Sequence, residues 1–442
     1  MPLFGRRKSA EPEASVREFE PLPDPPEPRV DGLRAMEDHR DYLLGSITEL
    51  PPFRQQLLDV VGLAICEDVL AGISLPGFDN SAMDGYAVRA ADVASASAEA
   101  PVSLPVVGEI PAGQSAPHRL APGTAMKIMT GAPIPDGADT IVPYENTDRG
   151  ETDVMIVAGS EPGKHIRRRG EDVTAGTELY RAGSLLGPRD VGLLAGIGLD
   201  SVLVRPRPRV VVISTGSELV EPGYRLDGEQ QIYDSNSFLL AAACRAAGAQ
   251  VFRVGRVSDD VDEVSQVITD QLIRADLILT TGGVSQGDYD LVKQVLPRLG
   301  RTDFARVAMQ PGKPQGFGLI GDDEVPIIML PGNPVSAFVS FEAFVRPVIR
   351  KLMGSYPYVR PELVCRAAEE IRSLPHRRQF ARGVVGLGPE GYREVRLVGG
   401  HGSHLLADLA RANALVIVPE EVEVVPAGGD VAVWMLTDDE AP

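Results

Sequence analysis

Cysteine and histidine are scarce in this chain, and basic residues are fewer than acidic ones. The three cysteines, Cys66, Cys244 and Cys365, form no CxxC or CxxH pair, so the sequence predicts neither a disulfide framework nor a zinc site. Six histidines without a Ser/His/Asp arrangement argue against a hydrolytic triad. The formal net charge of -19 argues against a general nucleic-acid or anionic-membrane binder, which would normally carry a basic excess.

Long apolar runs are absent as well. No stretch reaches the length of a membrane-spanning helix, and the first eight residues lack the apolar segment of a signal peptide. We therefore expect no membrane span, no nucleic-acid partner and a location in the reducing cytoplasm. What is present, 43% hydrophobic and 24% charged residues in a chain of 442, is typical of a soluble globular protein with more than one domain.

The first half of the chain changes character several times. Residues 1–34 are rich in Pro, Glu and Arg, and we expect a disordered tail. Apolar residues at helical spacing, among them Phe53, Leu57 and Val61, predict a discontinuous helical, elongated domain built from residues 35–72 and 167–204. Short Val/Ile runs punctuated by Gly and Pro predict an inserted β-rich module between these two pieces, at residues 73–166.

The second half has the texture of an α/β protein. After the proline-rich linker at 205–208, apolar strands alternate with helices up to residue 357, which predicts a parallel sheet covered by helices on both faces. In residues 358–442, short strands separated by Gly and Pro turns predict a C-terminal β barrel.

The turn at residues 78–88 concentrates two carboxylates, an amide and a hydroxyl between apolar residues. In such turns the side chains often bond their own backbone, so we expect Asp79 and Asp84 to be fixed in direction. Fixed carboxylates suit a metal ion or a reacting phosphate. For this turn alone, an ordinary polar turn before a strand would be the better explanation; the comparable clusters elsewhere in the chain favour a functional one.

Two glycine turns follow predicted parallel strands. Residues 280–290, TTGGVSQGDYD, come after the strand at 277–279 and before a helix, and STGSEL at 214–219 follows the first strand. A glycine turn at the carboxyl end of a parallel strand lets the backbone approach a phosphate, which the helix N-terminus also favours. Neither turn matches GxxxxGK[ST] or GxGxxG, so a P-loop or a dinucleotide site is not supported.

Cations and hydroxyls occur in loops that Pro and Gly make rigid. Lys313 in QPGKP and Ser336 in PGNPVS can donate to an anion without a large ordering cost, although rigid surface turns are an equal explanation for each loop alone. Three successive arginines at 167–169 suit a phosphate or a carboxylate, or they pair with the excess of acids.

Phosphoryl chemistry needs carboxylates that hold a hydrated Mg²⁺ and cations that neutralise anionic oxygens. Both kinds of group are present in these turns. The carboxylates are Asp79, Asp84, Asp172, Glu218, Asp288 and Asp290. From the residues alone, the sequence predicts a cytosolic Mg²⁺-dependent enzyme that acts on a phosphorylated or nucleotidylated small molecule.

The ordered set of motifs resembles the molybdopterin molybdenumtransferases, the group of bacterial MoeA and the gephyrin E-domain. The matching motifs are FDNSAMDGYAVR at 78–89, IMTGAPIPDGAD at 128–139, IRRRGED at 166–172, STGSEL at 214–219, TTGGVSQGDYD at 280–290, PGKP at 311–314 and LPGNPVSA at 330–337. The resemblance covers essentially everything after the N-terminal tail.

This resemblance implies an α/β multidomain protein: a molybdopterin-binding α/β domain, a discontinuous helical domain, an inserted β-rich domain and a C-terminal β barrel. It implies insertion of molybdate into adenylylated molybdopterin, with release of AMP and with Mg²⁺ as cofactor. It also implies an elongated homodimer whose cleft lies between the α/β domain of one subunit and the β module of the other. A molybdopterin adenylyltransferase and molybdoenzyme acceptors are the further partners that it suggests.

The resemblance and the clusters together assign roles to individual residues. The predicted catalytic residues are Asp84, Asp172, Glu218, Asp259 and Asp290. The predicted binding residues for the adenylylated pterin are Asp79, Thr130, Ser214, Thr215, Gly282, Gly283, Ser285, Gly287, Pro331 and Pro334. Molybdate is assigned to Lys313, Ser336, Arg382 and Ser403, and Mg²⁺ to Glu218, Asp288 and Asp290.

One position departs from the family pattern. Many relatives have Lys where this chain has Gln310, and the nearby basic residue is Arg306, so one anion contact is expected to be weaker or replaced. Two other functions were weighed. A gephyrin-like interaction scaffold with reduced or no catalysis does not need the intact set of carboxylates and cations. A molybdopterin adenylyltransferase, whose single domain is similar to residues 206–355, does not have the additional β modules.

Overall fold

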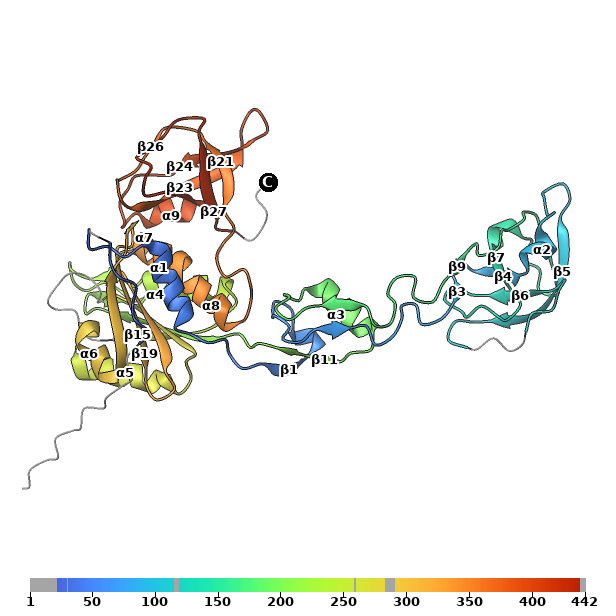
Figure 1. The fold of residues 1–442 in the computed structure, drawn as a ribbon, viewed down its shortest axis with the longest axis horizontal. Coiled ribbons are helices and arrows are strands. Elements are labelled where there is room, and N and C mark those ends of the chain that lie inside the picture. Colours follow the sequence, from blue (N-terminus) through green and yellow to red (C-terminus); the bar gives the residue numbers. More distant parts are fainter. Residues whose placement is uncertain (1–21, 30, 115–118, 258–259, 283–290, 438–442) are drawn as a thin grey trace, which may run out of the picture. The chain divides into compact units, whose positions relative to one another are not determined.

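The computed structural model describes residues 22–29, 31–114, 119–257, 260–282 and 291–437 (Figure 1). The chain divides into two compact units, one formed by Met1–Pro52 with Arg205–Pro442 and the other by Phe53–Val204. No helix in the described ranges combines the length and the apolarity that a membrane crossing would require.

A six-stranded sheet is the centre of the first unit. Its order is β15 (Gln250–Val257), β12 (Arg209–Thr215), β16 (Leu277–Thr281), β20 (Val325–Leu330), β19 (Pro314–Ile320) and β17 (Gly300–Arg306). The first four strands are parallel, as predicted, whereas β19 runs antiparallel to both of its neighbours. The predicted parallel sheet is thus extended by two strands that were not predicted. The short turn between β19 and β20 reverses the chain, because a parallel connection needs a long crossover.

Helices cover both faces of this sheet, as predicted. On one face α5 (Val261–Leu272) and α6 (Leu291–Leu299) share a core with alternate residues of β12, such as Val211 and Ile213. Val210 and Val212 are equally buried and point to the opposite face, where α4 (Asn236–Ala246) packs against β12.

The long helical pattern before residue 357 forms three consecutive pieces. These are α7 (Pro334–Ser340), a π-helical segment (Phe341–Val345) and α8 (Arg346–Leu352). The N-terminal helix α1 (Met36–Gly45) contacts the last two of these pieces and so belongs to the first unit.

Part of the predicted tail is an ordered element of the first unit. Arg34 is buried and donates to Asp303 at 2.6 Å, and Arg29 donates to the carbonyl of His376 at 2.7 Å. The prediction of disorder as far as residue 34 is therefore wrong over residues 31–34, because composition does not reveal a buried ion pair with a residue so far away in the sequence. Residues 1–21 and 30 lie outside the described ranges.

The C-terminal region is a closed five-stranded barrel, as predicted. Its strands are β23 (Arg378–Leu387), β24 (Arg393–Leu397), β21 (Leu363–Ala367), β27 (Asp430–Met435) and β25 (Ala414–Val418), and the pairing of β23 with β25 closes the ring. The two-residue strand β18 (Met309–Gln310) pairs in parallel with the start of β23. This pairing fixes the PGKP loop next to the barrel.

The inserted module of the second unit is β-rich, as predicted. Its five-stranded sheet has the order β7 (Thr140–Pro143), β4 (Gly85–Val88), β6 (Ala125–Ile128), β5 (Val102–Ile110) and β8 (Asp153–Ile156). Glycine is needed at position 85, where β4 pairs with β7, because a Cβ at this position would lie 2.1 Å from the carbonyl oxygen of Val142. The polar turn before β4 therefore leads directly into a strand that is tightly paired with β7.

The rest of the second unit is less helical than its sequence pattern predicts. Residues 53–56 form β1 (Phe53–Gln56), which pairs with β11 (Ser201–Val204), and β2 (Val69–Leu70) pairs with β10 (Glu178–Tyr180). Of the helices expected here, the structure has α3 (Pro188–Gly196) and one short 3-10 helix (Leu57–Asp59). The apolar spacing was misleading because Leu58 and Val61 are exposed and do not form a buried helix face. Each pairing joins residues from the two predicted pieces, 35–72 and 167–204.

Candidate functional site

A pocket of about 120 Å³ lies at the carboxyl ends of the parallel strands in the first unit. Thr215 ends β12, Thr281 ends β16, and Gly282, Gly332 and Pro334 follow in the loops after β16 and β20. The pocket thus brings together four predicted binding residues, Ser214, Thr215, Gly282 and Pro334, with the predicted catalytic residue Glu218. Pro331 lies next to them, because its carbonyl accepts a hydrogen bond from Thr281 Oγ1.

The glycines let the strand ends approach one another closely. Gly282 has a φ of +90°, and a Cβ there would lie 3.0 Å from the carbonyl oxygen of Thr215. A Cβ on Gly332 would lie 3.7 Å from the Cα of Gly282. Backbone groups and hydroxyls of three loops therefore meet without bulky side chains between them, which suits a phosphate group.

Asn236 is a pocket residue that sequence analysis missed. Its Nδ2 donates to Thr281 Oγ1 at 3.0 Å and to the carbonyl oxygen of Gly332 at 2.6 Å. Since a carbonyl oxygen only accepts, these bonds fix which end of the amide faces Gly332. The signal in the sequence was the Asp-Ser-Asn run at 234–236, where α4 begins, but the length of the loop at 216–233 hid its proximity to the strand ends.

Ser214 and Asp234 form the base of the pocket wall. Ser214 Oγ donates to Asp234 Oδ1 at 3.1 Å, and both side chains are buried. Asp234 also accepts the backbone N–H of Ser237 at 3.0 Å, in the first turn of α4. The hydroxyl of Ser214, which we expected to bind substrate, is thus engaged with the protein.

Glu218 lies on the pocket wall with an exposed side chain, in the segment between β12 and β13 (Leu219–Val220). Its carboxylate folds back over Gly216, where a Cβ would lie 2.6 Å from Glu218 Oε2. The backbone carbonyl of Glu218 accepts from Ile232 N–H at 2.9 Å. The direction of this carboxylate therefore depends on the glycine beneath it and on β14 (Ile232–Tyr233) beside it.

Six predicted site residues lie outside the described residues. They are Asp259, Gly283, Ser285, Gly287, Asp288 and Asp290. Their roles stay predictions.

Three of the four residues assigned to molybdate are close to one another. The backbone N–H of Val335, next to Ser336, donates to the carbonyl of Ser403 at 3.0 Å. Arg382 is 5% exposed and donates to the carbonyl oxygens of Gly400 and Gly402, in the loop that carries Ser403. Desolvation lowers the pKa of the Arg382 guanidinium below its ordinary value. Its positive charge is therefore buried against the loop that carries Ser403.

Lys313, the fourth of these residues, lies in a loop held rigid against α7. Gln315 Nε2 donates to the carbonyl of Gly312 and to Ser340 Oγ, and a Cβ on Gly312 would lie 2.7 Å from Ser340 Oγ. Desolvation, then Arg377 and Arg306, lower the pKa of Lys313. Among the described residues it has no ion pair, so its charge remains available to an anion. No hydrogen bond within these ranges joins it to Arg382.

In the second unit, Asp84 and Thr130 meet as a pair. Asp84 Oδ1 accepts from Thr130 N–H at 2.7 Å and from Thr130 Oγ1 at 2.8 Å. These two donors, the backbone N–H first, lower the pKa of Asp84 below its ordinary value. The side chain is exposed, so a fixed and ionised carboxylate faces solvent.

Asp79 is also fixed, by the arginine segment. It accepts from Arg169 N–H at 2.8 Å and from Arg168 at 2.7 Å, and these two donors lower its pKa. The expectation that the turn would bond its own backbone holds for Ser81, whose hydroxyl donates to the carbonyl of Met83, but it is wrong for Asp79 and Asp84. Their partners come from distant segments that no local pattern reveals. The side chain of Asp172, a predicted catalytic residue that follows this arginine segment in the sequence, is exposed to solvent.

Comparisons with known proteins agree with one another over most of the chain. The family description "MoeA N-terminal region (domain I and II)" matches residues 34–198, "Probable molybdopterin binding domain" matches 211–351, and "MoeA C-terminal region (domain IV)" matches 364–436. Molybdopterin molybdenumtransferase 2 of Mycobacterium tuberculosis is 45% identical over 411 residues, which are 92% of this chain and 100% of the relative. Molybdopterin molybdenumtransferase 1 of the same organism is 40% identical over 423 residues, 91% of this chain and 99% of the relative. Among solved structures, the molybdopterin biosynthesis MoeA protein from Pyrococcus horikosii has a TM-score of 0.77 at 30% identity, over 92% of this chain and 99% of that one.

Proposed function

Because the chain belongs to the molybdopterin molybdenumtransferase family, we propose that it inserts molybdate into adenylylated molybdopterin, with release of AMP. The observation that carries the proposal is the pocket in which Thr215, Gly282 and Gly332 converge at the ends of three parallel strands. Such a cradle of backbone groups and hydroxyls suits the pyrophosphate that links AMP to the pterin.

In this proposal the carboxylates polarise water or the molybdate and form no covalent intermediate. Glu218 is the pocket's own exposed carboxylate, and Asn236 joins the loops on which the phosphates rest. Asp84, held as an anion by Thr130, and Asp172 supply carboxylates from the second unit. An ionised carboxylate of fixed direction can orient a water molecule or a hydroxyl.

Mg²⁺ is part of the proposal. Within the described ranges no three His, Cys, Asp or Glu side chains form a metal cluster. Two carboxylates of the described residues line the pocket: Glu218, which is exposed, and Asp234, which is buried and accepts from Ser214 and Ser237. That donor set fits Mg²⁺, which is usually held by one or two carboxylates together with substrate phosphates. Glu218, with Asp288 and Asp290, would hold the ion, and the ion would neutralise charge on the phosphate oxygens.

Molybdate is the second substrate. Ser336, Arg382 and Ser403 offer hydroxyls and a desolvated cation, and Lys313 offers a charge without a carboxylate partner in the described part of the chain. A dianion that approaches a protein with a net charge of -19 needs such a local positive field. We propose that these four residues bind it.

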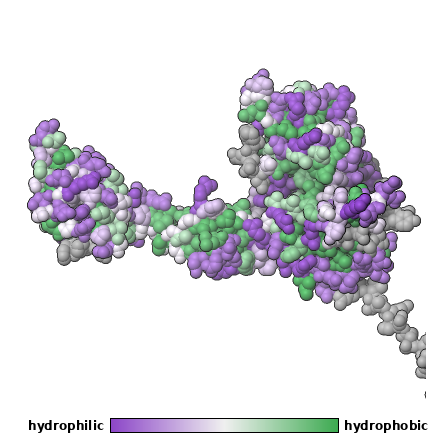
Figure 2. Space-filling model, turned by 180° about the vertical axis from the view of Figure 1, so that it is seen from behind, coloured by the Kyte–Doolittle hydropathy of each residue, from purple (hydrophilic) through white to green (hydrophobic). Residues whose placement is uncertain are grey.

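A homodimer is also proposed, with a cleft to which both copies contribute. Its support is the apolar surface of the second unit, where Leu58, Leu70, Ile73 and Leu185 are 87%, 57%, 48% and 50% exposed. Figure 2 shows apolar side chains gathered over the segment that carries β1, β11 and α3. Exposed apolar surface of this extent is typical of an association surface, and a second copy is the proposed occupant.

The cytoplasm is the proposed location, since all three cysteines are free thiols, which suits a reducing compartment. A molybdopterin adenylyltransferase as supplier and molybdoenzymes as acceptors are the proposed partners. A gephyrin-like scaffold is the weaker alternative, because the named relatives over more than 90% of the chain are molybdenumtransferases.

The proposal is tested by measuring AMP release from adenylylated molybdopterin as molybdate and Mg²⁺ are varied independently. We expect turnover that depends on both ions and that is abolished in a folded Asp84→Ala variant. Mixing Asp84→Ala with Glu218→Ala subunits should restore part of the activity if the cleft is shared. Full activity of Asp84→Ala would refute the assigned site, and no recovery after demonstrated subunit exchange would refute the shared cleft.

A further inference from the structure

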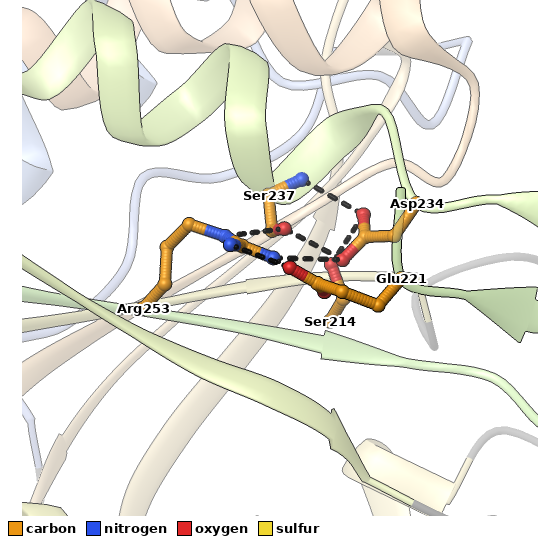
Figure 3. A network of polar contacts seen from close by, with 5 residues as sticks. All are labelled: Ser214, Glu221, Asp234, Ser237 and Arg253. Atoms are coloured by element: carbon orange, nitrogen blue, oxygen red, sulfur yellow. Dashed lines mark hydrogen bonds and ion pairs between the residues drawn. The ribbon is translucent and has the colours of Figure 1, made fainter. Parts of the chain in front are cut away.

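An arginine outside the pocket is connected to the segment that carries Glu218. Arg253 lies on β15, the edge strand, opposite Val212 of β12. Its Nη1 and Nη2 donate to the two carboxylate oxygens of Glu221 at 3.0 and 2.9 Å, and its Nε donates to Ser237 Oγ at 2.9 Å. Figure 3 shows these side chains converging from separate elements of the chain.

The guanidinium is held by protein groups: Nε, Nη1 and Nη2 each donate a hydrogen bond to Ser237 or Glu221. The face of its plane lies 3.7 Å from the ring centroid of Phe238, in addition to the contacts with Glu221 and Ser237. Arg253 is not among the residues that line the pocket. A bidentate arginine–carboxylate pair is a strong and directional contact. Because Arg253 does not line the pocket, any effect of Arg253 on the pocket must pass through the residues that it binds.

Those residues surround the loop between β12 and α4. Glu221 follows β13 directly and is three positions after Glu218. Asp234, at the other end of the loop, is 3% exposed and accepts Ser214 Oγ at 3.1 Å and Ser237 Oγ at 2.6 Å. The network therefore fastens both ends of the loop to the sheet and to the first turn of α4.

Within the loop, backbone bonds carry this attachment to Glu218. Asp234 N–H donates to the carbonyl of Val220 at 2.9 Å, and Ile232 N–H donates to the carbonyl of Glu218 at 2.9 Å. The short parallel pair β13 and β14 thus connects the two fastened ends. If the bond between Arg253 and Glu221 is lost, Glu221, three positions after Glu218, loses the contact that attaches its side chain to β15.

We propose that Arg253 is a positioning residue for the reaction: with Glu221 it holds the 216–221 segment so that the Glu218 carboxylate faces the pocket. The inference rests on the proposed function of that pocket. It adds Arg253 and Glu221, which do not line the pocket but position a residue that does. Because both side chains are charged and two parallel hydrogen bonds join them, the contact is stronger than a neutral hydrogen bond and fixes the orientation of the Glu221 carboxylate.

The test compares Glu221→Gln and Arg253→Lys with a matched control, Arg209→Lys. Arg209 also makes a bidentate pair, with Asp276 at 2.8 and 3.1 Å. Arg209 is the first residue of β12, so this pair lies at the end of the strand opposite to the pocket. The measurements are thermal unfolding, the number of AMP sites per chain by equilibrium dialysis, turnover per AMP site and the half-saturating molybdate concentration.

We expect turnover per AMP site to fall about tenfold or more in Glu221→Gln and Arg253→Lys, while the number of AMP sites and the molybdate midpoint stay at wild-type values. The double variant should be no slower than the slower single one, because both changes break the same contact. Arg209→Lys should keep wild-type turnover.

Each contrary outcome has a clear meaning. Unchanged turnover in Glu221→Gln would overturn the proposal, and so would an activity loss matched by a loss of AMP sites, since that indicates only unfolding. Should Arg253→Lys fail to fold, the isosteric Glu221→Gln decides alone. An inactive wild-type protein with intact AMP sites would instead contradict the proposed function.

Discussion

Gly216→Ala should reduce turnover while leaving most of the fold intact. Gly216 has a φ of +150°, and a methyl group there would lie 2.6 Å from Glu218 Oε2 and 2.9 Å from Glu218 Cδ. An ordinary contact is about 3.5 Å, so the carboxylate must move by about 1 Å. A displacement of this size at a reacting group can cost about a hundredfold in rate.

The stability cost should be smaller than the catalytic one. An alanine with this φ is strained by about 1–3 kcal/mol, and the carboxylate that it meets is the flexible end of an exposed side chain. The matched control is Gly255→Ala on β15, because Gly255 has no heavy atom within 4 Å of its added Cβ. Turnover by AMP release and unfolding in urea are measured for both variants. Turnover of folded Gly216→Ala within twofold of the control would refute the position assigned to the Glu218 carboxylate.

Three further predictions concern other groups. Lys313→Ala should raise the half-saturating molybdate concentration roughly ten- to a hundredfold, since a charge-assisted bond is worth on the order of 1.5–3 kcal/mol; a shift in pterin affinity instead would move Lys313 to the nucleotide. Thr130→Val should raise the pKa of Asp84 toward its ordinary value, because one of two donors to the carboxylate is lost; an unmoved carboxyl titration in carbon-13 NMR would contradict this. Burial lowers the pKa of His39 to about 3, so between pH 6.5 and about 3 the unfolded chain binds more protons and stability falls as the pH falls, by up to about 1.4 kcal/mol per pH unit. His39→Gln should flatten that dependence in urea unfolding between pH 7 and pH 5, and an equal slope in both proteins would exclude His39 as its source.

Much of the fold is predictable from the sequence because its signals are local. The apolar run of β12, the helix after Asn236 and the turns between barrel strands each follow from neighbouring residues. The helix expected near Phe53 failed for the opposite reason, since β1 is stabilised by pairing with β11, almost 150 residues later, and no local window contains that partner. The antiparallel strand β19 was missed because proline and glycine interrupt its apolar pattern, and β17 was missed because Arg301, Asp303 and Arg306 leave it with little apolar pattern.

The candidate site shows the same division. Glycine turns at strand ends indicated the pocket, because the ends of parallel strands meet at one edge of a sheet, and Thr215 and Gly282 do meet there. The partners that orient the carboxylates could not be predicted, since Thr130 is 46 positions from Asp84, and Arg168 is 89 positions from Asp79. Asn236 and Arg253 were missed because their importance lies in which loops they join, and only the three-dimensional structure shows that.

The most direct test of the central claim is the stoichiometry of the reaction catalysed by the purified protein. Adenylylated molybdopterin and molybdate are incubated with the enzyme and Mg²⁺, and released AMP is compared with the molybdenum bound to the pterin. We predict equal amounts of the two products, and no AMP when molybdate is omitted. AMP release that is independent of molybdate, or molybdenum binding without AMP release, would contradict the assignment as a molybdenumtransferase.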